Sequence, residues 1–158
     1  MIQLHWAINR AFEVLEKYDL WDTYVGLRQL RMICDNQDVY YTTFPFRGRI
    51  RERYVRTSDD IKVLTVDRRA LGDTAMHKHL IAHGLGHHFL HQGNHCHLHT
   101  LYLDKQEIEA EQFAAVLLVP PGVLRSEDSW TPKKIALRCR VPTNVAARRF
   151  RIMERVGM

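Results

Sequence analysis

Histidine is concentrated in one short segment of this chain. Nine of its ten histidines lie between residues 77 and 99. His79, His83, His87 and His91 stand at intervals of four residues, so they share one face if their segment is an α-helix. Imidazoles spaced in this way stand close enough to hold a single metal ion. The segment therefore predicts a helix whose histidine face is satisfied either by a metal ion or by solvent.

The overall composition favours one compact domain. The chain has 158 residues, of which 46 % are hydrophobic and 26 % are charged, which excludes a disordered or fibrous chain. No apolar run approaches the roughly 20 residues that span a bilayer, and the first residues do not resemble a signal peptide. We expect a cytoplasmic protein that does not contact membranes. Its three cysteines, Cys34, Cys96 and Cys139, are expected to be reduced thiols.

Charge is distributed unevenly along the chain. The net charge of +5 arises from two basic regions, residues 47–69 and 121–158, which flank a more acidic middle. The first region holds eight Lys or Arg against four acids, and the second holds nine against three. The middle, residues 70–120, holds two Lys, five acids and most of the histidines. We therefore expect the chemistry in the middle segment.

Hydrophobic periodicity predicts two helices followed by strands. Apolar residues at helical spacing indicate an amphipathic helix over about residues 7–18. A second, short helix can be capped by Thr23 and ends near Asp35. The pattern then changes to β-branched and aromatic runs separated by turn residues. These runs predict three strands, mostly antiparallel, at residues 39–44, 49–55 and 61–66.

Two further helices are expected to carry the chemistry. The first is capped near Asp73, runs to about His91 and contains two glycines, each of which weakens a helix by about 1 kcal/mol relative to Ala. The second follows a polar loop and stops at Pro120. Within the first helix, His83 and His87 form one i, i+4 pair. The pairs His79/His83 and His87/His91 have the same spacing, so the residues alone leave the choice open.

Three glutamates of the second helix can complete a metal site: Glu107, Glu109 and Glu111. A zinc ion with a catalytic role takes three protein ligands and leaves one position open for water. Glu107 shares a helical stripe with Ala110, and small residues allow two helices to approach closely. We therefore choose Glu107. Its alternative role is in helix capping, because the segment from Asp104 to Glu107 has the pattern of a capping box.

These two helices resemble those of a known family. The segments LIAHGLGHHFLH and EIEAEQFAAVLLVP are similar to the HELGHxxLH motif and the following E-x-E-A-x-x-F-A-x-x-L-L-x-P helix of the ImmA/IrrE metallopeptidases. The resemblance covers about residues 1–155 and includes the strand IKVLTVD. It implies one zinc ion held by His83, His87 and Glu107. It also implies that Glu111 and His91 stand behind these ligands.

One position departs from the family's motif. Where the family has the glutamate that acts as general base, this chain has Gly84. Loss of a positioned general base typically costs about 10²–10⁴-fold in rate. The chain is then a weak peptidase, a binding protein without peptidase activity, or a form from which the glutamate was removed on purpose. On this basis we expect a Gly84→Glu variant to hydrolyse peptides faster than the chain itself.

Four other histidines have no assignable counterpart in the family: His88, His95, His97 and His99. We expect them in a solvated or pH-sensitive loop. In an alternative interpretation, His97 or His99 faces the metal cleft and polarises a peptide carbonyl.

The basic C-terminal segment, residues 131–153, predicts two short helices joined at Val141 and Pro142. This layout is similar to a helix-turn-helix. Its cationic side chains can neutralise DNA phosphates or dock a partner repressor, or they can form the solvated surface of a helix pair that completes the core. The candidate contact residues are Lys133, Lys134, Arg148, Arg149 and Arg151.

Together these features predict an α+β fold, a compact zincin-like metallopeptidase with helices packed on a small three-stranded sheet. We expect residues 1–124 to form the metallopeptidase domain, and residues 125–158 to form a helix-turn-helix-like segment packed on the same unit. The expected function is zinc-dependent cleavage of a helix-turn-helix repressor in transcription regulation. The alternative is a non-catalytic metal-binding module that binds DNA or a repressor through its basic segment.

Overall fold

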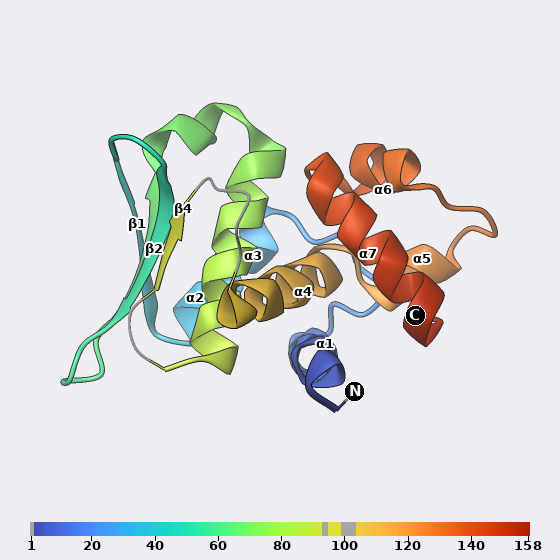
Figure 1. Ribbon diagram of the computed structural model, residues 1–158, viewed down its shortest axis with the longest axis horizontal. Coiled ribbons are helices and arrows are strands. Elements are labelled where there is room, and N and C mark those ends of the chain that lie inside the picture. The colour runs from blue at the N-terminus through green and yellow to red at the C-terminus, as the bar shows by residue number, and fades with distance from the viewer. Residues whose placement is uncertain (1, 93–94, 99–103) are drawn as a thin grey trace.

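The chain folds into a small sheet with helices packed beside it (Figure 1). The computed structural model describes residues 2–92, 95–98 and 104–158. The predicted α+β class is confirmed. In chain order the elements are α1 (Ile2–Lys17), α2 (Leu27–Asn36), β1 (Val39–Phe44), β2 (Ile50–Arg56), β3 (Lys62–Asp67), the 3₁₀ turn η1 (Arg68–Gly72), α3 (Thr74–Leu90), β4 (His95–Leu98), α4 (Lys105–Leu118), α5 (Pro121–Arg125), α6 (Pro132–Cys139) and α7 (Thr143–Val156).

The sheet has four described strands in the order β1-β3-β2-β4. β1 pairs in parallel with β3, whereas β2 is antiparallel to both β3 and β4. The three strands predicted from the sequence are present, and most pairings are antiparallel. The structure contains one strand that the sequence did not predict, β4, which is short and lies next to β2. The sequence did not reveal it because its residues, His-Cys-His-Leu, include no β-branched side chain.

The histidine-bearing helix α3 is enclosed by other elements. It lies between the sheet and α4 (Figure 1), and every residue from His77 to His88 is buried. Tyr54 of β2 and Leu64 of β3 are also buried, and both meet α3 from the sheet. A solvated histidine face is therefore excluded for this helix. Its imidazoles must find their partners inside the protein.

Helices α3 and α4 approach closely at Gly86. A Cβ atom added to Gly86 would lie 3.0 Å from the Cα atom of Ala110 and 3.1 Å from its carbonyl oxygen. A larger residue at position 86 would push the two helices apart. This crossing places the first turns of α4 against the histidine face, as the small residues of the second helix predict.

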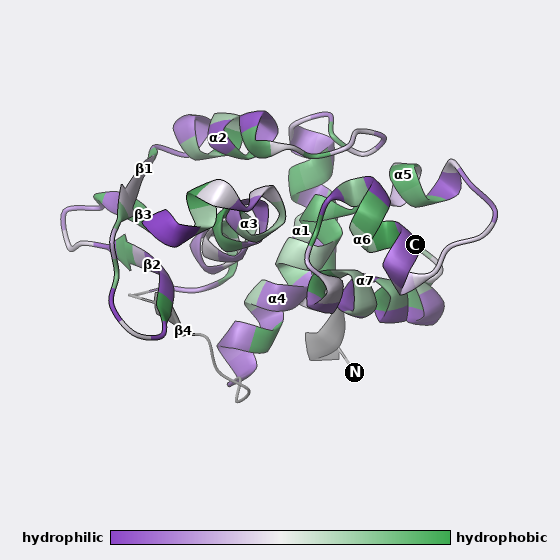
Figure 2. Cartoon of the chain, turned by 90° about the horizontal axis from the view of Figure 1, so that it is seen from above, coloured by the Kyte–Doolittle hydropathy of each residue, from purple (hydrophilic) through white to green (hydrophobic). Residues whose placement is uncertain are grey.

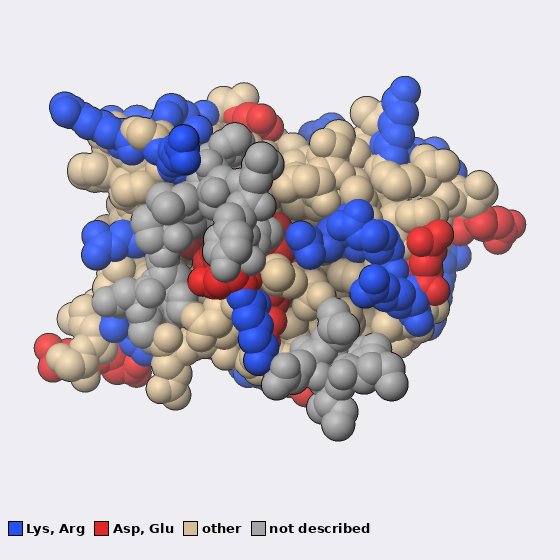
Figure 3. Space-filling view, viewed as in Figure 1, with Lys and Arg blue, Asp and Glu red and all other residues tan. Residues whose placement is uncertain are grey.

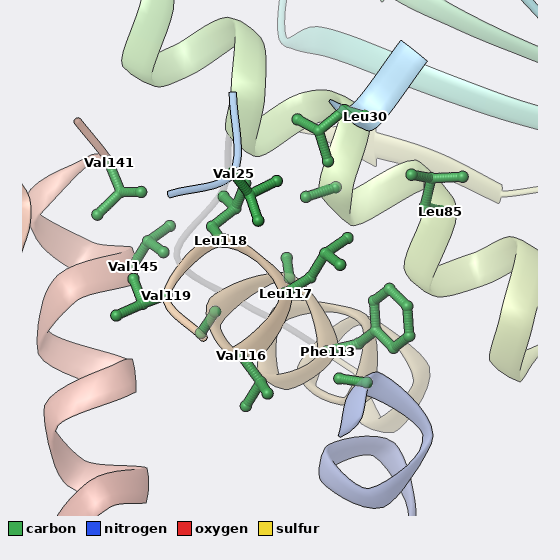
Figure 4. Close-up of a cluster of buried hydrophobic side chains, with 14 of the residues drawn as sticks. Val25, Leu30, Leu85, Phe113, Val116, Leu117, Leu118, Val119, Val141 and Val145 are labelled. Carbon is green, nitrogen blue, oxygen red and sulfur yellow. The ribbon is translucent and has the colours of Figure 1, made fainter. Parts of the chain in front are cut away.

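Helix α4 lies at the centre of the core and holds the C-terminal helices in place. Its residues from Glu109 to Leu118 are all buried. Val141 and Val145 point from the C-terminal segment toward the end of this helix (Figure 4). Figure 2 shows hydrophobic residues along α1 and α6, and α1 and α7 both pack against α4. The C-terminal segment therefore shares the core of the rest of the chain, while the boundary at residue 124 stays a prediction.

The second helix begins later than the sequence predicts. α2 starts at Leu27 with Gly26 as its N-cap, and the Gly26 N–H donates to the side-chain oxygen of Gln29 at 2.9 Å. Thr23 is therefore not the cap.

Among the described helices, none combines the length and apolar character that a membrane crossing needs.

Candidate metal centre

Two imidazoles and one carboxylate converge where α3 crosses the start of α4. The Nε2 atoms of His83 and His87 lie 3.2 Å apart. Each lies 2.9 Å from a different carboxylate oxygen of Glu107. Both histidines are fully buried, and the Glu107 side chain is 17 % exposed. The structure thus brings together the three residues proposed as ligands and leaves the carboxylate on the more open side.

The start of α4 fixes the position of Glu107. Asp104 is the N-cap of this helix, and its side chain accepts a hydrogen bond from the Glu107 N–H at 2.9 Å. The Glu107 carboxylate, in contrast, faces the two histidines. The backbone of Glu107 therefore takes part in the cap, while its side chain remains available as a ligand.

Glu111 lies behind His83, one turn along α4. Its Oε1 atom is 2.9 Å from Nδ1 of His83, and its Oε2 atom is 2.9 Å from Nε2 of His79. A carboxylate in this position fixes the ring orientation and tautomer of the histidine that it contacts. Glu111 therefore holds His83 so that Nε2 faces His87 and Glu107.

A second chain of contacts lies behind His87. Its Nδ1 atom is 3.0 Å from Nδ1 of His91, the C-cap residue of α3. Nε2 of His91 is 3.6 Å from Glu109, which also accepts a hydrogen bond from the indole N–H of Trp6. His91 thus occupies the place behind His87 that the family resemblance implies.

Among the described residues, two groups have the geometry to hold a metal ion. One is His83, His87 and Glu107, and the other is His79, His83 and Glu111. They share His83, which presents Nε2 to the first group and Nδ1 to Glu111. The first group includes the least buried carboxylate and therefore offers the better access for a ligand from outside.

The charges at this centre favour a cation. Burial lowers the pKa of His83, but the charge of Glu111 and hydrogen bonds with Glu107 and Glu111 outweigh this effect and hold the pKa well above its ordinary value. Burial raises the pKa of Glu111, but His79 and His83 hold it well below its ordinary value. The buried carboxylates therefore attract positive charge, which a divalent ion also provides.

Glu52 of β2 reaches the same centre from the sheet. It is fully buried, and its Oε2 atom lies 4.0 Å from Nε2 of His83. Burial raises the pKa of Glu52 to about 8; the charge of His83 opposes this rise, and Glu107 and Glu111 add to it. The sequence interpretation missed this residue. The available signal was the alternation along β2, which places Glu52 on the same inward face as Tyr54.

Gly84 faces β3, where no room remains for a side chain. A Cβ atom added to Gly84 would lie 2.2 Å from Cδ1 of the fully buried Leu64. The position that carries a glutamate in the family's motif is therefore closed in this chain. A substitution at position 84 requires Leu64 to move.

His88 belongs to the core, so its expected position in a loop is wrong. Its Nε2 atom lies 2.9 Å from the side-chain oxygen of Gln37, and its Nδ1 atom lies 2.8 Å from the Tyr54 hydroxyl. Because an amide oxygen only accepts, Nε2 donates to Gln37 and the Tyr54 hydroxyl donates to Nδ1. Burial lowers the pKa of His88 to about 4, so the ring is neutral. His99 and the side chains of His95 and His97 lie outside what the structure describes.

The basic candidates of the C-terminal segment differ in accessibility. Lys and Arg side chains gather over the face where α6 and α7 lie (Figure 3). Lys133 and Arg151 are exposed, and Arg148 is half-buried. Lys134 forms an ion pair with Glu127. Lys133 and Arg151 therefore remain the cations best placed to meet a partner.

Arg149 has a different role from the one expected. It is 0 % exposed, and its Nε atom donates to the carbonyl oxygen of Val119 at 2.7 Å. A second nitrogen donates to the carbonyl oxygen of Met158 at 2.7 Å. The guanidinium caps the end of α4 inside the protein. Arg149 is therefore removed from the set of surface residues that can contact DNA or a partner.

Comparison with known families identifies the family of the chain. Residues 34–151 match the family model of the IrrE N-terminal-like domain, Peptidase M78. This range includes α3 and α4 and covers more than half of the chain. The chain belongs to the ImmA/IrrE family. This family is one of zinc-dependent metallopeptidases. A separate comparison with curated proteins finds no match for the chain.

The donor set of this ImmA/IrrE member fits zinc. Zinc sites with a catalytic role use three protein ligands, and two imidazole nitrogens with one carboxylate oxygen is a common set. The buried His83 and His87, together with the more accessible Glu107, supply these donors within 3.2 Å of one another.

Proposed function

We propose that this chain is a zinc-dependent peptidase that binds one zinc ion through His83, His87 and Glu107 and cleaves a regulatory protein. One observation carries the proposal. The Nε2 atoms of both histidines and the two oxygens of Glu107 converge at 2.9–3.2 Å. Two imidazole nitrogens and a carboxylate from two crossing helices, all facing one point, are the donor set that a zinc ion takes.

Each residue has a distinct task. His83, His87 and Glu107 hold the metal ion, while Glu111 and His91 orient the two imidazoles through their Nδ1 atoms. When bound, zinc supplies a Lewis acid that polarises a peptide carbonyl and acidifies water. The buried surroundings of α3 exclude other solvent from the centre.

The proposed partner is a helix-turn-helix repressor in the cytoplasm. The family resemblance supports a role in transcription regulation, and the basic face of α6 and α7 offers a docking surface for it. Lys133 and Arg151 are exposed there. In this proposal residues 1–124 carry the chemistry, and residues 125–158 help to position the partner or DNA.

A second candidate function is a non-catalytic regulatory module. α3 contains no glutamate that could act as a base, and Leu64 closes the space at Gly84. A chain that keeps the metal ligands and lacks a base would bind a repressor or DNA without cleaving it.

The experiment begins by expressing the proteins encoded next to the gene of this chain, and any helix-turn-helix repressor among them is tested as the substrate. The chain is tested loaded with zinc, after treatment with a chelator, and after zinc is restored. A His83→Ala/His87→Ala variant serves as the control. We expect one new N-terminus in the repressor, detected by mass spectrometry, which disappears with the chelator and in the variant. Stable binding without cleavage would favour the second candidate. If the His83→Ala/His87→Ala variant kept both its zinc and its cleavage activity, the metal assignment would be contradicted.

A further inference from the structure

Glu52 has an unusual environment for a carboxylate of a β-strand. It lies on the inward face of β2, level with Val66 of β3, and is 0 % exposed. Its Oε2 atom points to the metal centre, 4.0 Å from Nε2 of His83. Within the part of the chain that the structure describes, neither of its oxygens has a hydrogen-bond partner.

Comparison with Asp67 shows that this environment is not required by the sheet. Asp67 ends β3 and its side chain is equally buried, at 0 % exposure. Its Oδ2 atom lies 2.5 Å from Nε of Arg69, and its Oδ1 atom accepts from the Arg69 N–H at 3.3 Å. Asp67 thus has partners that stabilise the fold. A buried carboxylate without such partners costs stability, and such groups occur mainly where function requires them.

The position of Glu52 also differs from that of a metal ligand. It belongs to neither of the two groups whose donor atoms all lie within 4.8 Å of one another. It therefore stands beside the set formed by His83, His87 and Glu107, on the side of the sheet. A carboxylate at that place can contact a water molecule or a substrate atom held at the centre.

We propose that Glu52 is the general base of this peptidase and replaces, from strand β2, the glutamate that α3 lacks at position 84. The inference rests on the proposed peptidase function. This role accounts for two observations: the space at Gly84 is closed, and a buried carboxylate approaches the same centre from β2.

The proton balance of this step is complete. In peptide hydrolysis, the oxygen of a water molecule bonds to the carbonyl carbon, and the bond from that carbon to the amide nitrogen breaks. The Glu52 carboxylate, which a divalent cation held at the neighbouring site would keep ionised, takes one proton from the attacking water and passes it to the leaving nitrogen. The carboxylate is regenerated, and no other reactant is needed.

The test uses Glu52→Gln, with Asp67→Asn as the matched buried control. The first readout is affinity for Zn²⁺, measured by competition with a chelator. The second is affinity of the zinc-loaded protein for acetohydroxamate, a small chelating probe whose hydroxyl proton binds a neighbouring acceptor. The third is the rate of repressor cleavage. The fourth is the melting temperature of the metal-free protein.

We expect Glu52→Gln to keep its zinc affinity within about threefold of the unchanged chain. Its acetohydroxamate affinity should fall at least about tenfold, because a hydrogen bond to a charged group is lost. Its cleavage rate should fall about 10²–10⁴-fold. Its melting temperature should not fall, whereas that of Asp67→Asn should, because only Asp67 has partners to lose. Glu52→Asp, which keeps the charge on a shorter side chain, should lose less cleavage than Glu52→Gln.

Other outcomes separate this inference from the proposed function. Equal acetohydroxamate affinity and equal cleavage in Glu52→Gln would overturn the role of Glu52 and leave the peptidase function standing. A loss of zinc affinity in that variant would make Glu52 a ligand and would also overturn the role. If the unchanged chain does not bind zinc, the proposed function fails and the inference fails with it. If it binds zinc without cleaving, the acetohydroxamate result alone decides on Glu52.

Discussion

Leu64 occupies the space that a side chain at position 84 needs, since a Cβ atom added to Gly84 would lie 2.2 Å from its Cδ1 atom. We predict that Gly84→Ala destabilises the protein by about 1–3 kcal/mol, although alanine favours helices over glycine. Gly72→Ala is the control, because no atom lies within 4 Å of a Cβ added there. Urea denaturation measures both. Equal stability of the two variants would show that Leu64 moves aside freely.

The same packing changes the expectation for Gly84→Glu. The motif alone led us to expect faster hydrolysis from this variant. The structure predicts no gain, because the added side chain must first displace the buried Leu64. Adding Leu64→Ala should restore part of the stability lost by Gly84→Glu, since the two changes act on one contact. Faster cleavage by Gly84→Glu alone would contradict this prediction.

The metal-free protein should lose stability as the pH rises from 6.5 to 8. The folded-state pKa of His83 is raised well above its ordinary value, and that of Glu52 is raised to about 8. In this range the folded protein therefore retains protons that the unfolded chain has released. Each such proton contributes a slope of about 1.4 kcal/mol per pH unit. Below pH 6.5, His77 and His88, whose pKa values are lowered, act in the opposite direction.

Denaturation in the presence of a chelator at several pH values measures this slope. The Glu52→Gln variant should show a shallower slope, because one of the two proton sites is removed. Saturating zinc should abolish the decline, since metal binding requires deprotonated ligands and strengthens with pH. A metal-free stability that is constant or rises between pH 6.5 and 8 would be inconsistent with the buried proton sites.

Glu111→Gln should weaken zinc binding by about 10–100-fold. The reason is the contact of 2.9 Å between Glu111 and Nδ1 of His83, which orients the ligand and makes it more basic. Glu13→Gln on the exposed side of α1 is the control and should leave zinc affinity unchanged. Competition with a chelator measures both variants. An unchanged affinity in Glu111→Gln would remove Glu111 from the support of the centre.

Two neighbouring arginines of α7 should respond differently to the same change. Arg149→Met removes a buried hydrogen bond to the Val119 carbonyl and should cost about 1–3 kcal/mol of stability. Arg151→Met changes an exposed residue and should stay within about 0.5 kcal/mol. If DNA binding is present, only Arg151→Met should reduce its dependence on salt. A stable Arg149→Met variant with weakened DNA binding would reverse this assignment.

The sequence predicted the helices of the centre because their signals are local. The i, i+4 spacing of His83 and His87 and the cap at Asp104 depend on residues within one helix. The crossing of the two helices followed from small residues, and Gly86 against Ala110 has this role in the structure. Patterns of this kind can be predicted from the sequence because they depend on residues close to one another along the chain.

The contributions that the sequence missed come from distant segments. Glu52 precedes His83 by 31 positions and reaches it only through the pairing of β2 with β3. The exclusion of side chains at Gly84 depends on Leu64 in another strand. Arg149 looks like a surface cation in the basic run, and its burial depends on the end of α4. Such relationships require the register of the sheet and the packing of helices.

The metal assignment is tested most directly by a crystal structure of the zinc-soaked protein with anomalous data at the zinc absorption edge. The account predicts one anomalous peak at about 2.0–2.2 Å from Nε2 of His83, Nε2 of His87 and an oxygen of Glu107. A peak between His79, His83 and Glu111 instead, or no peak at either group, would contradict it.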